Sequence, residues 1–346
     1  MLFQKLVAAA CLGFELAALA TPAQKKQDRK LKWFGINESG AEFGEKNFTG
    51  VYGREYIWYD AKTIDAFMAQ GMNMFRLNFR AADTNGIAHQ VMERLTPNSL
   101  AGPFDALYLG NLTEQINYIT SRGGYAMVQP HNYGRFYGAV MTDTAGFQTW
   151  WHNVAAQYAN NSLVVFDTNN EYHDMPQALV FALNQAAING IRAAGALSQY
   201  ITPEGNAWSG AWTWVSSGNG ASLLALHDPS NKLIYQMHQY LDGDGSGTSP
   251  TCVSGTVLRE RLQAATEWLT DNGKQGVIGE FAGGSNELCV AALKDGLAFL
   301  AENAGVWWGA VWWAAGPWWA DYMFSMEPER GVAWVGVLPE IRGAFL

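Results

Sequence analysis

Charged residues are scarce in this chain of 346 residues: Asp, Glu, Lys and Arg together make up 15% of it. Basic residues are the rarer kind, because 22 Lys and Arg stand against 31 Asp and Glu, for a formal net charge of −9. An acidic surface repels phosphate backbones, so the composition argues against nucleic-acid binding. Hydrophobic residues reach 49%, which predicts a globular chain with a large core rather than a disordered one.

Long hydrophobic runs are also few. After the first 20 residues, no segment reaches about 18 apolar residues without a charge, so no transmembrane helix is expected. At the N-terminus, Lys5 precedes an apolar run that ends in Ala-Leu-Ala at residue 20, a pattern that predicts a secretory signal peptide over residues 1–20. A basic stretch follows, which we interpret as a propeptide over 21–30. The alternative for the apolar run is a buried helix, but we expect a secreted, extracellular protein.

Only three cysteines are present. Cys11 would leave with the signal peptide, so in an oxidising compartment Cys252 and Cys289 are expected to form a disulfide; two free buried thiols are the alternative. Sequons for N-glycosylation, which fit secretion, begin at Asn47, Asn111 and Asn160.

Aromatic residues, by contrast, are abundant: the chain has 15 Trp, 14 Tyr and 17 Phe. Flat apolar faces with a polar edge suit sugar rings, so the surplus favours a carbohydrate ligand. Six tryptophans crowd residues 307–319. From their spacing we expect Trp308 and Trp312 to face packed helices, and Trp313, Trp318 and Trp319 to face a cleft.

Short β-rich runs alternate with helical ones from residue 33 onward. The predicted strands are 34–38, 74–79, 125–129, 163–169, 200–203, 233–239, 276–280 and 306–313. The predicted helices are 64–70, 113–122, 147–160, 177–194, 221–226, 256–272, 288–303 and 337–345. Eight strand–helix units predict a single α/β domain over 31–346, folded as a (β/α)₈ TIM barrel. A doubly wound sheet is the alternative, but the first strand is not followed by G-x-G-x-x-G.

Functional groups of such a barrel stand at the C-terminal ends of the strands. Glu171 and Glu280 end the fourth and seventh predicted strands, and a facing pair of carboxylates is what glycosidic cleavage requires. The alternative is that each glutamate merely neutralises a buried arginine. Two such glutamates, with histidines (His131, His238) and tryptophans at neighbouring strand ends, favour catalysis; Arg76 and Tyr240 could tune the pKa values of the pair.

Several segments carry a family resemblance. They are FRLNF at 75–79, FDTNNEYHD at 166–174, MHQYLD at 237–242, IGEFAGG at 278–284 and WWAAGPWW at 312–319. The chain resembles, from about Trp33 to Pro328, the secreted fungal endo-β-1,4-glucanases of glycoside hydrolase family 5. The resemblance implies a retaining mechanism with no metal and no cofactor, and it matches the family's bridge between Cys252 and Cys289. The tail after Pro328 departs from the family pattern.

The resemblance also implies roles for individual residues. It makes Glu171 the acid/base and Glu280 the nucleophile. Binding roles fall to residues around them: Arg76 and Tyr240 against the nucleophile, Asn170 on the sugar 2-hydroxyl, His131 and His238 around the central subsite, Trp313 under its ring, and Trp208 and Trp212 as cleft walls.

No metal motif stands out. Asp242-Gly-Asp-Gly-Ser-Gly247 begins like a calcium loop, but its twelfth position is Val253 instead of Glu, so a surface loop is expected. We therefore expect a monomeric endo-β-1,4-glucanase acting on β-glucan. A β-mannanase or mixed-linkage glucanase stays open within the class, as does a non-catalytic sugar-binding barrel outside it. Preference among cellulose, glucomannan and xyloglucan depends on loop shape and is not predicted.

Overall fold

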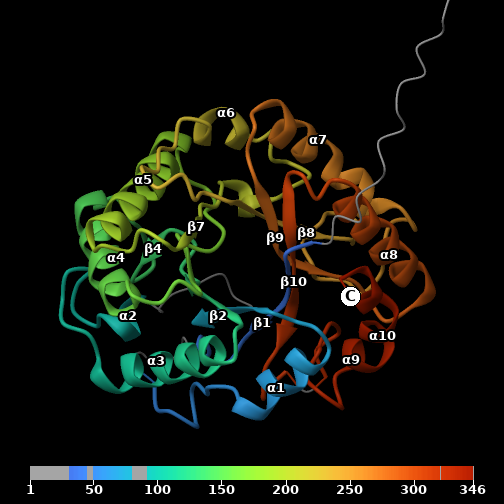
Figure 1. The fold of residues 1–346 in the computed structure, drawn as a ribbon, viewed down its shortest axis with the longest axis horizontal. Coiled ribbons are helices and arrows are strands. Elements are labelled where there is room, and N and C mark those ends of the chain that lie inside the picture. The colour runs from blue at the N-terminus through green and yellow to red at the C-terminus, as the bar shows by residue number, and fades with distance from the viewer. Residues whose placement is uncertain (1–30, 45–49, 80–91, 320, 346) are drawn as a thin grey trace, which may run out of the picture.

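The computed structural model describes residues 31–44, 50–79, 92–319 and 321–345. The predicted signal peptide, the propeptide and the Asn47 sequon lie outside these ranges. The described chain contains an eight-stranded parallel sheet in the order β7-β6-β3-β2-β1-β10-β9-β8, surrounded by helices (Figure 1). Parallel bridges from Ile201 to Leu233 and from Glu204 to Gln236 join the β7 and β8 edges and close the sheet. The predicted (β/α)₈ barrel is therefore confirmed.

The barrel strands follow the predicted ranges closely. They are β1(Trp33–Glu38), β2(Met74–Phe79), β3(Tyr125–Pro130), β6(Val164–Asp167), β7(Tyr200–Thr202), β8(Tyr235–Tyr240), β9(Gly276–Ala282) and β10(Trp307–Ala315). A small antiparallel hairpin, β4(Arg135–Phe136) and β5(Ala139–Val140), follows β3 and was not predicted.

The helices are α1(Ala61–Ala69), α2(Met92–Leu95), α3(Ala106–Ser121), α4(Thr144–Tyr158), α5(Gln177–Ala193), α6(Asn219–Leu223), α7(Val257–Asp271), α8(Glu287–Glu302), α9(Val332–Gly336) and α10(Leu338–Ile341), with 3₁₀ turns η1(Ala207–Ser209) and η2(Arg342–Ala344). Aspartates cap three of them: Asp60, Asp105 and Asp143 each accept a backbone N–H of the first turn. The cap at Asp105 explains why α3 begins seven residues before the predicted start at 113.

The N-terminal half of the barrel interior is filled by apolar side chains. Trp33, Met74, Met127, Val165, Ile234, Val277 and Val311 form this cluster, and each is at most 1% exposed. Because this end is packed solid, the polar groups further along the same strands can meet only at the C-terminal end.

Trp308 contradicts its predicted position. It packs inside the barrel against Trp33 at 5.0 Å and Tyr200 at 4.7 Å, not against the helices. The cause is an irregularity in the β10 register between Trp307 and Ala310, since one extra residue turns every preceding side chain to the other face. Trp312 does face outward, as expected, and packs on Phe281 at 5.3 Å.

The C-terminal tail closes the outer layer. Instead of the single helix predicted at 337–345, α9, α10 and η2 follow one another, and Phe345 stacks on Phe34 with ring centroids 3.8 Å apart. A disulfide joins Cys252 to Cys289 at the start of α8, with Cα atoms 5.3 Å apart. Within the described residues, every helix is too short or too polar to cross a membrane.

Candidate active site

Glu280 points into the barrel because β9 carries a bulge. The register between β8 and β9 shifts after Met237 and Ile278, so that His238 pairs with Glu280 and Gly279 is the extra residue. A Cβ on Gly279 would lie 2.4 Å from the Gln236 side chain, so this position accepts only glycine without rearrangement. Val277 and Glu280 can therefore both face inward, and Glu280 lies beside His238.

Two donors hold the Glu280 carboxylate, which is 3% exposed. Nη1 of Arg76, from β2, lies 2.6 Å from Oε1, and the Tyr240 hydroxyl donates to Oε2 at 2.6 Å. Charge-assisted hydrogen bonds of this kind favour the ionised carboxylate. Burial and the Glu280 charge raise the pKa of Tyr240 well above its ordinary value, so this hydroxyl remains a donor.

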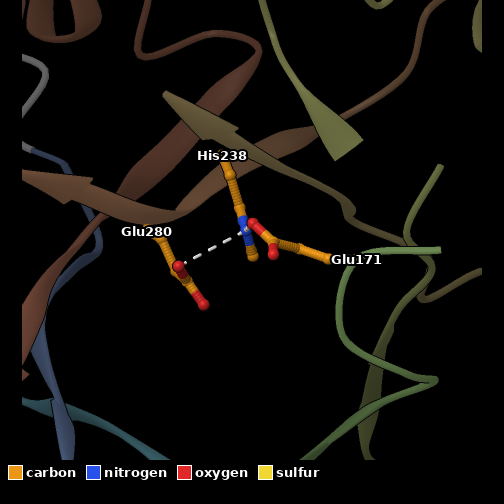
Figure 2. A group of neighbouring side chains, drawn as sticks. All are labelled: Glu171, His238 and Glu280. Atoms are coloured by element: carbon orange, nitrogen blue, oxygen red, sulfur yellow. Dashed lines mark hydrogen bonds and ion pairs between the residues drawn. The ribbon is translucent and has the colours of Figure 1, made fainter. Parts of the chain in front are cut away.

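Glu171 follows β6 by four residues and has a left-handed backbone with φ of 47°. Its Oε1 accepts a hydrogen bond from Nδ1 of His238 at 2.8 Å. Figure 2 shows Glu171, His238 and Glu280 converging, and ligand atoms of the three lie within 4.8 Å of one another. Burial and the nearby charge of Glu280 raise the pKa of Glu171, which favours a protonated carboxyl there.

The two cations of the site stay charged. Burial alone would lower the pKa of His238, but Glu280, Glu204 and the hydrogen bond to Glu171 outweigh it and raise that pKa well above its usual range. For Arg76 burial likewise opposes charge, and three carboxylates raise its pKa. Among the described residues, Glu171, His238 and Glu280 have the spacing of metal ligands. An imidazolium cannot coordinate a metal, and Arg76 repels a cation, so we assign no metal to this group.

An open cleft of about 1070 Å³ lies above the carboxylates. Trp313 lines it, and the His131 ring stacks on Trp313 at 5.4 Å. Trp208 and Trp212 line it as well and are 51% and 49% exposed. Both are braced, because Trp208 stacks on His173 at 4.7 Å and Arg261 lies 4.3 Å from the Trp212 ring centre. Of the tryptophans expected in the cleft, Trp318 and Trp319 are not among its lining residues.

Asn170 lies next to Arg76 at the floor of the site. Its Oδ1 accepts a hydrogen bond from Arg76 at 2.7 Å, and the residue is fully buried. Its Nδ2 has no hydrogen-bond partner within the described part of the chain. A buried amide donor without a partner is costly unless a ligand supplies an acceptor.

Sequence reasoning missed a buried polar layer under the pair. Arg76 Nε donates to Asp167 at 2.9 Å, its Nη2 lies 3.0 Å from Glu204, and Asn37 accepts from Nη1 at 2.8 Å. Burial and the charge of Glu204 raise the pKa of Asp167 to about 8. Glu204 could have been found, because it stands just after β7 as Glu171 and Glu280 stand at their own strand ends.

Known proteins match this arrangement along most of the chain. Residues 36–316 match the family model described as Cellulase (glycosyl hydrolase family 5). The chain is 53% identical to endo-beta-1,4-glucanase B of Aspergillus niger, over 98% of each chain. It is 55% identical to endo-beta-1,4-glucanase B of Emericella nidulans, over 93% of each chain. The solved structure of XacCel5A in complex with cellopentaose superposes with a TM-score of 0.84 at 32% identity, covering 91% of this chain and 99% of that one. With the barrel, the facing carboxylates and this similarity together, the chain belongs to the cellulases of glycosyl hydrolase family 5.

Proposed function

We propose that this protein is a retaining endo-β-1,4-glucanase in which Glu280 is the nucleophile and Glu171 the acid/base. The observation that carries the proposal is the distance of at most 4.8 Å between carboxylate oxygens of Glu171 and Glu280. Retaining glycosidases place their carboxyl groups about 5–5.5 Å apart, whereas inverting ones leave about 6.5–9.5 Å for a water molecule.

In the first step a carboxylate oxygen of Glu280 attacks the anomeric carbon. The bond between that carbon and the glycosidic oxygen breaks, and the electron pair of the bond goes to the oxygen, which takes the proton of Glu171. The raised pKa of Glu171 supports this role, since the acid must hold its proton until the leaving group departs. The product of the step is a glycosyl ester on Glu280 and a free chain end.

In the second step water attacks the same carbon. Glu171, now a carboxylate, takes a proton from the water, and the ester bond to Glu280 breaks, so both residues return to their starting states. Two displacements restore the β-configuration. Arg76 and Tyr240 stabilise the departing carboxylate of Glu280 through the contacts at 2.6 Å.

The binding contacts are assigned to groups of the site that a sugar could satisfy: a polar atom without a partner and exposed aromatic faces. The free Nδ2 of Asn170 supports a hydrogen bond to the sugar 2-hydroxyl. Trp313, held by His131, offers a flat face for the ring at the central subsite. Trp208 and Trp212, each about half exposed, offer faces for sugars further along the cleft.

We also infer that the protein is secreted as a monomer after loss of residues 1–20 and, in a second cut, of 21–30. The disulfide supports an oxidising compartment. Asn160 is exposed in the turn after α4 and Asn111 is half-buried on α3, so the Asn160 sequon is the one more accessible to a glycan.

The test is reducing-end release from carboxymethyl cellulose, mannan, xyloglucan and mixed-linkage glucan, together with proton NMR of a cleaved cello-oligosaccharide. We expect cleavage of β-1,4-glucan with the β-anomer appearing first. Early appearance of the α-anomer would make Glu280 a base instead of a nucleophile. Faster cleavage of mannan would move the protein to another activity of its family, and binding without cleavage would make it a sugar-binding barrel.

A further inference from the structure

Glu204 touches three parts of the hydrolytic site without reaching the cleft. It follows β7 and is fully buried. Its Oε2 accepts the backbone N–H of Glu171 at 2.7 Å. Its Oε1 lies 3.0 Å from Nη2 of Arg76 and 3.4 Å from Nε2 of His238. One carboxylate therefore contacts the backbone of Glu171, the Arg76 guanidinium that binds Glu280, and the His238 ring that faces both glutamates.

The contact with the Glu171 backbone has a structural consequence. Glu171 has φ of 47°, a left-handed conformation that non-glycine residues rarely adopt. The hydrogen bond from its own N–H to a buried carboxylate is charge-assisted and fixes the peptide at this residue. The direction in which the Glu171 side chain leaves the backbone, and so its approach to Glu280, depends on that peptide.

The contacts with the cations have an electrostatic consequence. Nδ1 of His238 faces Glu171 and Glu280, while Nε2 faces Glu204, so Glu204 lies on the side of the ring away from the reacting carboxylates. An anion there favours an imidazolium that donates toward Glu171. Burial alone would raise the pKa of Glu204, but His238 and Arg76 hold it below the usual range, so the carboxylate is charged.

Glu204 is itself held in place. Nε2 of Gln236 donates to Oε1 of Glu204 and, at 2.6 Å, to Oδ2 of Asp167. The glycine at 279 leaves the space that Gln236 occupies. The position of the carboxylate is thus determined by β6, β8 and β9 together.

We propose that Glu204 is a positioning residue of this site: its carboxylate fixes the backbone from which Glu171 projects and keeps His238 cationic beside Glu171. The proposal rests on the proposed function for the roles of Glu171 and Glu280. Two substitutions test the backbone contact and the charge separately. Glu204→Gln keeps the length of the side chain but removes its charge, whereas Glu204→Asp keeps the charge but shortens the reach to the Glu171 N–H.

The experiment measures kcat and KM on cellotetraose across pH for both variants, and follows the His238 ring by NMR, assigned by its loss in His238→Gln. For Glu204→Gln we expect kcat to fall about 10- to 100-fold with KM little changed. The His238 ring should lose its proton at lower pH than in the wild type, and the alkaline limb of kcat/KM should move to lower pH because an anion near Glu171 is gone. For Glu204→Asp we expect a lower kcat with the alkaline limb and the His238 titration close to wild type.

Asp228→Asn is the matched control. Asp228 is another buried carboxylate paired with an arginine, Arg192 at 2.7 Å, and it does not line the cleft. The Asp228→Asn variant should have a lower melting temperature but the same acid and alkaline limbs of the kcat/KM pH profile as wild type.

Two results would overturn the proposal. One is wild-type kcat/KM in both folded Glu204 variants. The other is a loss by the same factor at every pH with an unchanged His238 titration, which would reduce Glu204 to a structural role. Should neither variant fold, the wild-type titration decides, since a His238 ring that loses its proton near pH 6.5 contradicts the electrostatic part. Absence of cleavage by the wild type would instead contradict the proposed function, and the NMR titration would still report on Glu204.

Discussion

Glu171 and Glu280 approach within 4.8 Å of each other at their carboxylate oxygens, yet their surroundings differ. Glu280 is bound by Arg76 and Tyr240, both at 2.6 Å, and its side chain is 4% exposed. Glu171 accepts one side-chain hydrogen bond, from His238, and its side chain is 14% exposed toward the cleft. Two positively polarised donors stabilise an anion, while a carboxyl with a raised pKa and an open edge can exchange protons with substrate and water.

This asymmetry predicts different chemical rescue of the two glutamates. Glu171→Gln and Glu280→Gln should each lower kcat on β-glucan by about 10²–10⁴-fold or more, because in the proposed mechanism each removes a group that acts in the transition state. Azide should restore part of the turnover of Glu171→Ala, since it can attack the glycosyl-enzyme without a base, but none of Glu280→Gln, which forms no ester. Circular dichroism checks that the variants fold. Rescue of the Glu280 variant alone would reverse the two roles.

Trp313 and Trp268 allow stacking on substrate to be separated from packing. Trp313 lines the cleft, whereas Trp268 lies on α7 and packs against Tyr235 at 5.1 Å and Trp214 at 5.6 Å. Trp313→Ala should lower kcat/KM about 10- to 100-fold, equivalent to about 1.4–2.8 kcal/mol of transition-state stabilisation. Trp268→Ala should lower the melting temperature and leave kcat/KM within a few-fold of wild type. Equal kinetic losses in the two variants would contradict a sugar-stacking role for Trp313.

The strand pattern could be predicted from the sequence, whereas the irregularities in the strands could not. Alternating β-rich and helical runs located all eight barrel strands, and their ends located Glu171 and Glu280. Reading side-chain direction from an unbroken two-residue period failed at Trp308, because the period restarts at the β10 irregularity. The same effect at Gly279 is what turns Glu280 inward, and a glycine within a strand was the signal for it.

Glu204 was missed for a different reason. It stands just past a predicted strand, 200–203, as Glu171 does, but it lies in none of the segments that carry the family resemblance. Its role depends on contacts with Arg76 and His238 from strands far away in sequence, which only the closed barrel brings together.

The disulfide should contribute stability but no chemistry. Cys252 and Cys289 are 37 positions apart in the sequence, and the chain-entropy model assigns a loop of this length about 3–4 kcal/mol. Cys252→Ser with Cys289→Ser should therefore lower the free energy of unfolding by about that amount in a denaturant titration. Activity at 25 °C should persist, because neither residue lines the cleft. Loss of activity in a folded double variant would indicate that the bridge positions the site.

Glu38 is a buried carboxyl that does not line the cleft, and its titration should make the stability of the fold depend on pH. It ends β1, is 1% exposed, and neither carboxyl oxygen has a hydrogen-bond partner within the described ranges. Burial, with the charges of Glu327 and Glu42, raises its pKa well above the ordinary value. Between the ordinary pKa and this raised one, the unfolded chain loses the proton while the folded protein keeps it. Folding stability must therefore fall as pH rises through this window and be fully retained below it.

Glu38→Gln removes this titration, so the difference in the free energy of unfolding between the variant and wild type should depend on pH. Relative to wild type, the variant should gain stability as the pH rises above the ordinary glutamate pKa of about 4.3, by about 1.4 kcal/mol for each tenfold increase in proton affinity that folding gives Glu38. Thermal melts of both proteins across this range measure the difference, in which the raised pKa values of Asp167 and Glu171 cancel because both proteins contain them. Glu267→Gln, at an exposed position on α7, is the control and should run parallel to wild type at every pH. A Glu38→Gln curve that also runs parallel to wild type would mean that Glu38 titrates alike in the folded and unfolded states, which its burial without a partner argues against.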